Sequence, residues 1–137
     1  MDTLTHERRS EIMGRVRSKN TRPELAVRRL LHRMGYRFRL HRANLPGKPD
    51  IVLSRLDVVV FVNGCFWHRH TGCPSTRMPK SRLAFWREKF ASNVRRDRKA
   101  RRDLRRAGWR VLVVWECQVG NEERLSRRIR SFLEDMA

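Results

Sequence analysis

The ten residues from Gly64 to Cys73 place the strongest constraint on how this chain can fold. They include two cysteines, two histidines and two large aromatic residues, a mixture that neither a core strand nor an ordinary surface loop favours. The apolar run 58–62, which only Asn63 separates from this stretch, is typical of a buried strand. The fold must therefore hold this stretch at the point where a strand leaves the core.

Thiols and imidazoles at this spacing indicate a structural zinc site. Cys65, His70 and Cys73 are close enough in sequence to share one ion, and Cys117, after a second apolar run, can supply the fourth ligand. Three thiolates and one imidazole complete the tetrahedron that zinc prefers and leave no open position for a substrate. His68 competes with His70 as the histidine ligand, and three buried free thiols are the alternative to a metal site. The odd number of cysteines argues against a disulfide framework.

Hydrophobic periodicity predicts an α/β fold, a single domain with a central mixed β-sheet flanked by helices. We expect helices over 21–34, 81–106 and from 121 onward, and strands over 36–41, 51–53, 57–62 and 109–115. Thr21 and Glu24 have the spacing of a capping box, which explains Glu24 structurally and leaves a metal-site role as the alternative. Ser81 is the expected cap of the second helix. Residues 1–20 are predicted to be a basic N-terminal arm, and residues 21–137 the domain itself.

The net charge indicates a nucleic-acid partner. The chain has 33 Lys and Arg against 14 Asp and Glu, which gives a net charge of +19. Such an excess repels itself unless a polyanion neutralises it. The second half of the predicted helix 81–106 carries many of these charges and is expected to face phosphates. No apolar run reaches the roughly 18–20 residues that a membrane span needs, and the N-terminus lacks a signal-peptide core. We therefore expect a cytoplasmic protein that does not act at a membrane.

Asp50 and His68 are the residue types that hydrolysis of a phosphodiester requires. Asp50 follows Pro49 at the edge of the strand 51–53, a pattern that can hold a carboxylate rigidly but that also occurs in plain turns. A carboxylate binds a hard cation such as Mg²⁺, which neutralises phosphate charge and lowers the pKa of bound water. A neutral histidine can accept a proton from that water.

Four segments of the chain closely resemble the Vsr family, the very-short-patch DNA mismatch endonucleases. They are residues 13–24, 45–52, 60–68 and 108–117. The resemblance implies an endonuclease domain with a core like that of type II restriction endonucleases. It implies Mg²⁺-dependent nicking of one DNA strand on the 5′ side of the thymine in a T:G mismatch, which arises when 5-methylcytosine deaminates. It also implies a monomer that works at the prokaryotic nucleoid with mismatch-repair proteins and alongside a cytosine methyltransferase.

The resemblance also assigns roles to individual residues. Asp50 and the backbone carbonyl of Val62 would bind Mg²⁺, Glu24 would hold a water on the metal, and His68 would be the general base or acid. The implied zinc ligands are Cys65, His70, Cys73 and Cys117, and the implied aromatic wedge that enters the DNA stack is Phe66, Trp67 and Trp86.

The chain departs from the family pattern at Asn63. The family has a histidine at this position, two residues before the first zinc cysteine. Asn63 can orient a water or a phosphate but cannot take a proton. The lysine common in restriction-type sites also has no candidate after Asp50, so His68 would have to replace it.

Two alternative functions keep the same residues in other roles. A zinc-stabilised nucleic-acid-binding protein without catalysis would use the charge and the zinc and treat Asp50 as turn chemistry. A restriction-type endonuclease would cut intact duplex and show no preference for a mismatch.

Overall fold

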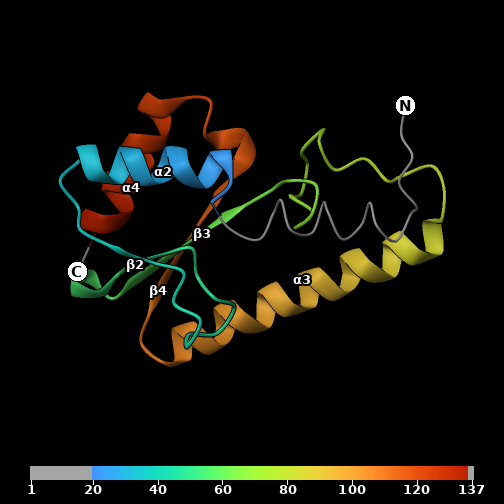
Figure 1. Ribbon diagram of the computed structural model, residues 1–137, viewed down its shortest axis with the longest axis horizontal. Helices are drawn as coiled ribbons and strands as arrows, with labels where there is room; N and C mark the ends of the chain where they lie inside the picture. The colour runs from blue at the N-terminus through green and yellow to red at the C-terminus, as the bar shows by residue number, and fades with distance from the viewer. Residues whose placement is uncertain (1–19, 136–137) are drawn as a thin grey trace.

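The computed structural model describes residues 20–135, and the chain forms three layers with a four-stranded sheet in the middle (Figure 1). The helices are α2 (Arg22–Arg33), α3 (Leu83–Arg106) and α4 (Glu122–Glu134), and the strands are β1 (Arg39–Leu40), β2 (Ile51–Leu53), β3 (Val58–Asn63) and β4 (Arg110–Trp115). Two single 3-10 turns, η1 (Ser54–Leu56) and η2 (Glu116–Gln118), follow β2 and β4. The sheet order is β1-β2-β3-β4, antiparallel up to β3 and parallel between β3 and β4. The predicted α/β domain with a mixed sheet is confirmed. The predicted basic arm lies outside the described residues, apart from Asn20.

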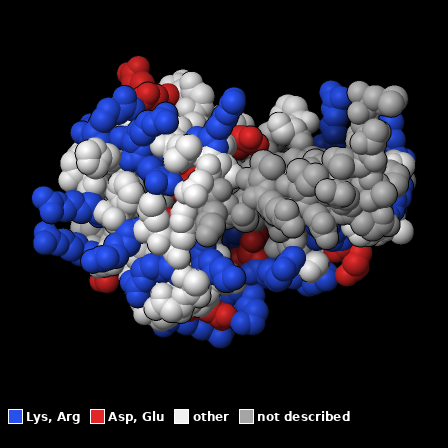
Figure 2. All heavy atoms as spheres, in the orientation of Figure 1, with Lys and Arg blue, Asp and Glu red and all other residues white. Residues whose placement is uncertain are grey.

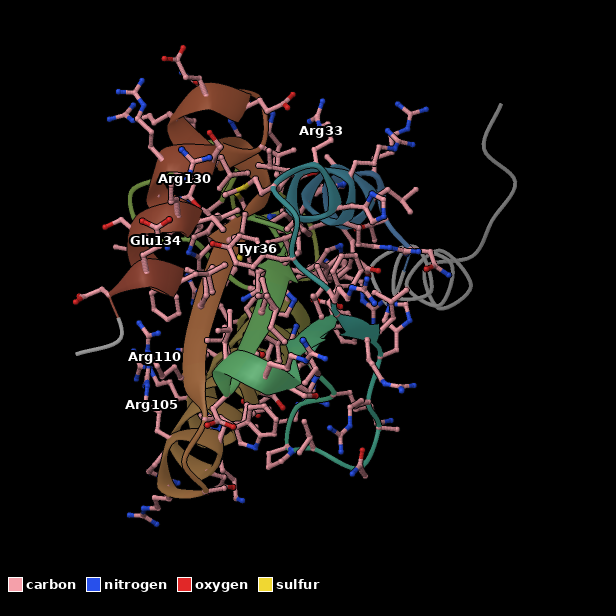
Figure 3. All side chains as sticks on the ribbon, turned by 90° about the vertical axis from the view of Figure 1, so that its left-hand side faces the viewer. Arg33, Tyr36, Arg105, Arg110, Arg130 and Glu134 are labelled. Carbon is pink, nitrogen blue, oxygen red and sulfur yellow. The ribbon has the colours of Figure 1, made fainter. Side chains whose placement is uncertain are left out.

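Each face of the sheet is covered by helices because side chains alternate along the strands. Val58 and Val60 of β3 point toward α2 and α4, in a core that also contains the apolar residues of those helices. Val59 points to the other face, where it packs with Leu104 of α3. Figures 1 and 3 show α2 and α4 on one side of the sheet and α3 on the other. The central strands are therefore apolar at every position except Asn63 at the end of β3 and Arg110 at the start of β4.

Helix α2 begins as the sequence predicts, but one bond of the expected capping box is replaced. The Thr21 side chain accepts a hydrogen bond from the Glu24 amide at 3.3 Å, and a proline occupies the first turn. The Glu24 carboxylate bonds the amide of Asn20, at 3.1 Å, where a capping box has a bond to the N-cap amide of Thr21. Capping therefore does not fully explain Glu24, and its other oxygen faces the interior.

Two other expectations about element ends are wrong. The cap of α3 is Arg82, not Ser81: Arg82 adopts a left-handed φ of 55° and provides no side-chain cap, while its guanidinium lies 4.3 Å from the Phe85 ring centroid. Strand β1 has two residues, although alternation predicts six. The amide of Tyr36 bonds back to Leu31 at the end of α2, and a left-handed φ of 48° at His41 ends the strand.

The loop before β2 approaches α3 closely at Gly47. This residue has a φ of +72°, and a Cβ placed there would lie 2.6 Å from the Cβ of Ala100 and 3.2 Å from the Phe61 ring. A side chain at Gly47 would therefore push the loop away from α3. The loop leads directly into Asp50, so its packing against α3 lies next to the candidate site.

We expect Gly47→Ala to lower the free energy of unfolding by about 2–4 kcal/mol, the sum of a strained left-handed alanine and an overpacked contact. Gly35→Ala is the matched control, because Gly35 also has a positive φ (+89°) but nothing lies within 4 Å of its added Cβ. Urea unfolding of both variants separates the two effects. Equal losses of stability would contradict the close approach to α3.

Candidate active site and metal centre

A pocket of about 540 Å³ opens between the carboxyl end of β3, the loop before β2 and the middle of α3. Its polar lining includes Lys48, Asp50, Asn63, His68, Arg96 and Asp97. The structure thus brings together Asp50, Asn63 and His68, three residues that the sequence singled out from two separate segments. Basic and acidic groups face the same space, as a site for a phosphate and a cation requires.

Asp50 is held in place by the backbone of the neighbouring strand. Its Oδ2 accepts a hydrogen bond from the Val62 amide at 2.7 Å. Burial, with a smaller contribution from the nearby Glu24 carboxylate, raises the pKa of Asp50 to about 7 against the lowering effect of that amide bond. The carboxylate lacks the water that would stabilise its charge, so a bound cation would favour its ionised form. Ligation by the Val62 carbonyl stays a prediction.

Glu24 is buried, with 1% of its surface exposed, and has a partner that sequence reasoning missed. Its Oε2 lies 2.8 Å from Nε2 of His41 and 3.2 Å from a guanidinium nitrogen of Arg28. His41 also donates its backbone N–H to the Asp50 carbonyl at 3.1 Å, because the register of β1 and β2 places the two residues opposite each other. Glu24, His41 and Asp50 each present a possible ligand atom within 4.8 Å of the others.

His68 is paired with a second residue that sequence reasoning missed. Its Nδ1 lies 2.6 Å from Oδ2 of Asp97 in α3. An ionised carboxylate can only accept, so this contact assigns the ring proton to Nδ1 and leaves Nε2 with a free lone pair. In the sequence Asp97 is one of two acids interrupting a run of arginines, and the basic run hid its role. The available signal was an acid in the middle of a helix whose second half is otherwise suited to phosphates.

Asn63 lies at the end of β3 with 5% of its surface exposed. Among the described residues, its side-chain amide makes no hydrogen bond, although it lines the pocket. A buried amide without a partner is costly and normally has a water or a ligand beside it. The residue that departs from the family pattern is therefore placed to hold a polar group in the pocket.

The three cysteines and His70 converge on one point beside this pocket. Nδ1 of His70 lies 3.7 Å from Sγ of Cys65 and 3.5 Å from Sγ of Cys117, and all four ligand atoms, with Cys73, lie within 4.8 Å. Zinc bonds of about 2.3 Å to sulfur and 2.0–2.1 Å to nitrogen give a tetrahedral edge of about 3.6 Å. The donor set fits zinc. The structure places His70 among the thiols and His68 in the pocket; zinc ligation itself stays a prediction.

The residues around the cluster orient His70 and shift the pKa values of two of the thiols. The His70 ring stacks on Trp115 with centroids 4.3 Å apart and planes 10° apart. Burial raises the pKa of the Cys65 thiol to about 12, whereas a backbone hydrogen bond from Ser75 lowers that of Cys73. Without a metal the buried thiol stays protonated, and a bound zinc ion would ionise it.

The three predicted wedge residues form one aromatic cluster with Phe90 of α3. Phe66 lies 5.1 Å from Trp67 and 5.2 Å from Phe90, and Trp86 stacks on Phe90 at 5.5 Å. Trp67 is 8% exposed, whereas Phe66 and Trp86 are half-buried. Strand β3 ends at Asn63, so Phe66 and Trp67 lie in a turn, which lets adjacent rings face the same side. The wedge role stays a prediction.

Positive charge surrounds these features. Helix α3 carries ten Lys and Arg residues and three acids. Figure 2 shows Lys and Arg side chains spread over much of the described surface, including that of α3 along the lower edge. None of the helices between residues 20 and 135 has the length and hydropathy of a membrane span.

Comparison with known proteins gives consistent matches. The family model described as DNA mismatch endonuclease Vsr matches residues 1–75. The type II nicking enzyme V.XorIIP of Xanthomonas oryzae pv. oryzae is 53% identical over 133 residues, which cover 97% of each chain. V.NmeAIP, a type II nicking enzyme of Neisseria meningitidis, is 44% identical over 94% of each chain. The DNA mismatch endonuclease Vsr of Escherichia coli is 42% identical over 86% of this chain and 75% of its own length.

We expect purified protein never exposed to a chelator to contain about one zinc ion per chain. Cys65→Ser should lose the metal and lower the thermal midpoint, because it removes the buried ligand of the cluster and with it the link that the metal makes between two segments of the chain. His68→Ala is the matched control, since it removes the other histidine of the same turn, and its zinc content should be unchanged. Elemental analysis with thermal unfolding measures both. A folded, zinc-free wild-type protein, or zinc loss in His68→Ala, would contradict the assignment.

Proposed function

The chain belongs to the Vsr family of DNA mismatch endonucleases, and from that premise we propose that it is a DNA endonuclease that nicks one strand on the 5′ side of the thymine in a T:G mismatch. The proposal includes mismatches that arise from deamination of 5-methylcytosine. The observation that carries it is the pocket in which Asp50 and the His68–Asp97 pair face the same space. We place its work in the bacterial nucleoid, as a monomer, with mismatch-repair proteins as partners.

The chemistry we propose is hydrolysis of a phosphodiester. A water oxygen forms a bond to phosphorus, the bond to the leaving sugar oxygen breaks, and that oxygen takes up a proton. Nε2 of His68 accepts the proton of the attacking water, while Asp97 holds the ring and stabilises its positive charge. Asn63 orients the water or a phosphate oxygen with its side-chain amide, which has no hydrogen-bond partner among residues 20–135.

Asp50 supplies the anionic oxygen for a catalytic divalent cation, which we take to be Mg²⁺. The cation, when bound, neutralises the phosphate charge and favours ionisation of the attacking water. Asp50 is suited to this because the Val62 amide fixes its carboxylate, and because the loop before it packs closely against α3 at Gly47. Zn²⁺ at the cluster of Cys65, His70, Cys73 and Cys117 has a structural role, since its four protein ligands leave no open position.

Lys and Arg contacts to phosphates account for most of the affinity in this proposal. Lys48, Arg96 and Arg101 line the pocket, and the arginines of α3 continue along the helix. Binding should therefore weaken steeply with salt. The aromatic cluster contributes selectivity, because separating stacked bases costs least at a mismatch. Within it, half-buried Phe66 and Trp86 are better placed to enter DNA than Trp67.

The test is a nicking assay with Mg²⁺ on three duplexes of identical flanking sequence that contain T:G, T:A or C:G. We expect a nick 5′ of the thymine in the T:G duplex alone. Asp50→Asn and His68→Ala should each lower the rate about 10²–10⁴-fold, the range for losing a catalytic acid–base or metal-binding group. Asp103→Asn is the control, because this acid also lies in α3 but pairs with Lys99 and does not line the pocket.

Other outcomes would identify the alternatives. Equal cutting of the three duplexes would indicate a restriction-type endonuclease. Tight binding without product in any divalent cation would indicate a binding protein without catalysis. Unchanged rates in Asp50→Asn and His68→Ala would show that the pocket is not the active site.

A further inference from the structure

His41 joins Glu24 and Asp50 in a cluster that the proposed roles leave partly unused. Nε2 of His41 lies 2.8 Å from Oε2 of Glu24, and these two residues and Asp50 offer three possible ligand atoms within 4.8 Å of one another. Glu24 and His41 do not line the pocket, whereas Asp50 does. Asp50 therefore stands between the pocket that contains His68 and the pair formed by Glu24 and His41.

We propose that Glu24, His41 and Asp50 form a divalent-cation site in which the imidazole nitrogen of His41 is a direct ligand, so that the site selects Mn²⁺ over Mg²⁺. The inference rests on the proposed function in one respect, because Asp50 belongs to the proposed catalytic site. Mg²⁺ still binds and supports nicking there, and His41 adds a preference for Mn²⁺. It goes beyond that function by giving Glu24 a direct ligand role, adding a nitrogen donor and specifying the class of ion.

The donor set decides the ion. Mg²⁺ takes oxygen ligands almost exclusively and keeps several waters, whereas Mn²⁺ accepts carboxylates and also tolerates imidazole. Two carboxylates and one imidazole therefore suit Mn²⁺ better. In the structure Nε2 of His41 lies 2.8 Å from the Glu24 carboxylate, which can only accept, so the ring proton lies on Nε2. Coordination requires that proton to leave, with the neutral ring carrying its single proton on Nδ1 instead.

The charges of the cluster leave room for a cation. The carboxylates of Glu24 and Asp50 together carry two negative charges when both are ionised, and Arg28, 3.2 Å from Glu24, offsets one of them. The remaining negative charge is largely shielded from water, since Glu24 is 1% exposed and Asp50 is half-buried. A divalent cation neutralises it, and the excess positive charge then favours a DNA phosphate at the same place.

A separate observation concerns the polar lining next to Asp50. The Asn63 amide is buried, lines the same pocket as Asp50, and has no hydrogen-bond partner among residues 20–135. Its carbonyl oxygen can accept from a water on a bound cation. The backbone holds His41 in reach of such an ion, because its N–H bonds the Asp50 carbonyl at 3.1 Å.

The test measures binding of the metal itself to the full chain with zinc bound. Mn²⁺ is titrated into the protein, the free ion is followed by electron paramagnetic resonance, and Mg²⁺ is added as competitor. We expect wild-type protein to bind Mn²⁺ at least about tenfold more tightly than Mg²⁺. Pulsed measurements on the Mn²⁺ complex should show coupling to a ¹⁴N nucleus.

His41→Gln should weaken Mn²⁺ binding about tenfold or more, leave Mg²⁺ binding within about twofold, and remove the ¹⁴N coupling. The glutamine keeps an N–H donor for Glu24, so the variant separates coordination from hydrogen bonding. His41→Asn is the second variant, because asparagine tolerates the left-handed backbone of this position. His32→Gln, an exposed histidine of the same helix as Glu24, is the matched control and should behave as wild type.

Two results would overturn the proposal. Unchanged Mn²⁺ selectivity in folded His41→Gln and His41→Asn would show that His41 only orients Glu24 by a hydrogen bond. A ¹⁴N coupling that survives in both variants and disappears in His68→Gln would assign the nitrogen ligand to His68. Failure of the proposed function is distinguishable, because it is measured by the nicking assay: equal cutting of the three duplexes, no product, or wild-type rates in Asp50→Asn, whatever the metal selectivity.

Discussion

The parallel pairing of β3 with β4 is the constraint on which the candidate site depends. Its register runs from Val58 opposite Arg110 to Asn63 opposite Trp115, so both strands end at the same edge of the sheet. The turn after β3 and the 3-10 turn after β4 therefore meet, which brings Cys117 to His70 across 47 positions of sequence. Ligand and substrate sites of open α/β sheets commonly lie at the carboxyl ends of parallel strands for this reason.

Negative charge is buried within this strongly basic protein. The net charge is +19, yet Glu24 is buried beside Arg28 and Asp97 is half-buried beside His68. The arginines do not neutralise Asp50: burial and the Glu24 carboxylate both raise its pKa. The basic surface attracts DNA, while the acidic interior attracts cations. A phosphate in the pocket would bring the two kinds of charge together.

Much of the fold follows from the sequence, because apolar alternation and turn residues act locally. The helices, the central strands and the Thr21 cap are where the pattern predicts them. Strand β1 was overestimated because the backbone conformation of His41 ends it, and periodicity carries no information on φ. The cap of α3 was missed for the same reason.

The site was predictable where chemistry is concentrated in one motif and unpredictable where two distant residues meet. The composition of the stretch from Gly64 to Cys73 is sufficient to identify it as a candidate site. His41 and Asp97 do not, because each acquires its role from a partner 17 or 29 positions away. The choice between His68 and His70 also needed the structure, since the turns of the chain determine which ring meets the thiols.

The central claim is that Asp50 and His68 act on the same phosphate. A double-mutant cycle tests it by single-turnover nicking of a T:G duplex, with Asp50→Asn, His68→Ala and the double variant. Residues that act on one phosphate in one pocket lose their joint effect when either is removed. If Asp50 and His68 act together, the double variant is about as slow as the slower single variant. A double variant whose loss equals the product of the two single losses would contradict it, because the two residues would then act independently.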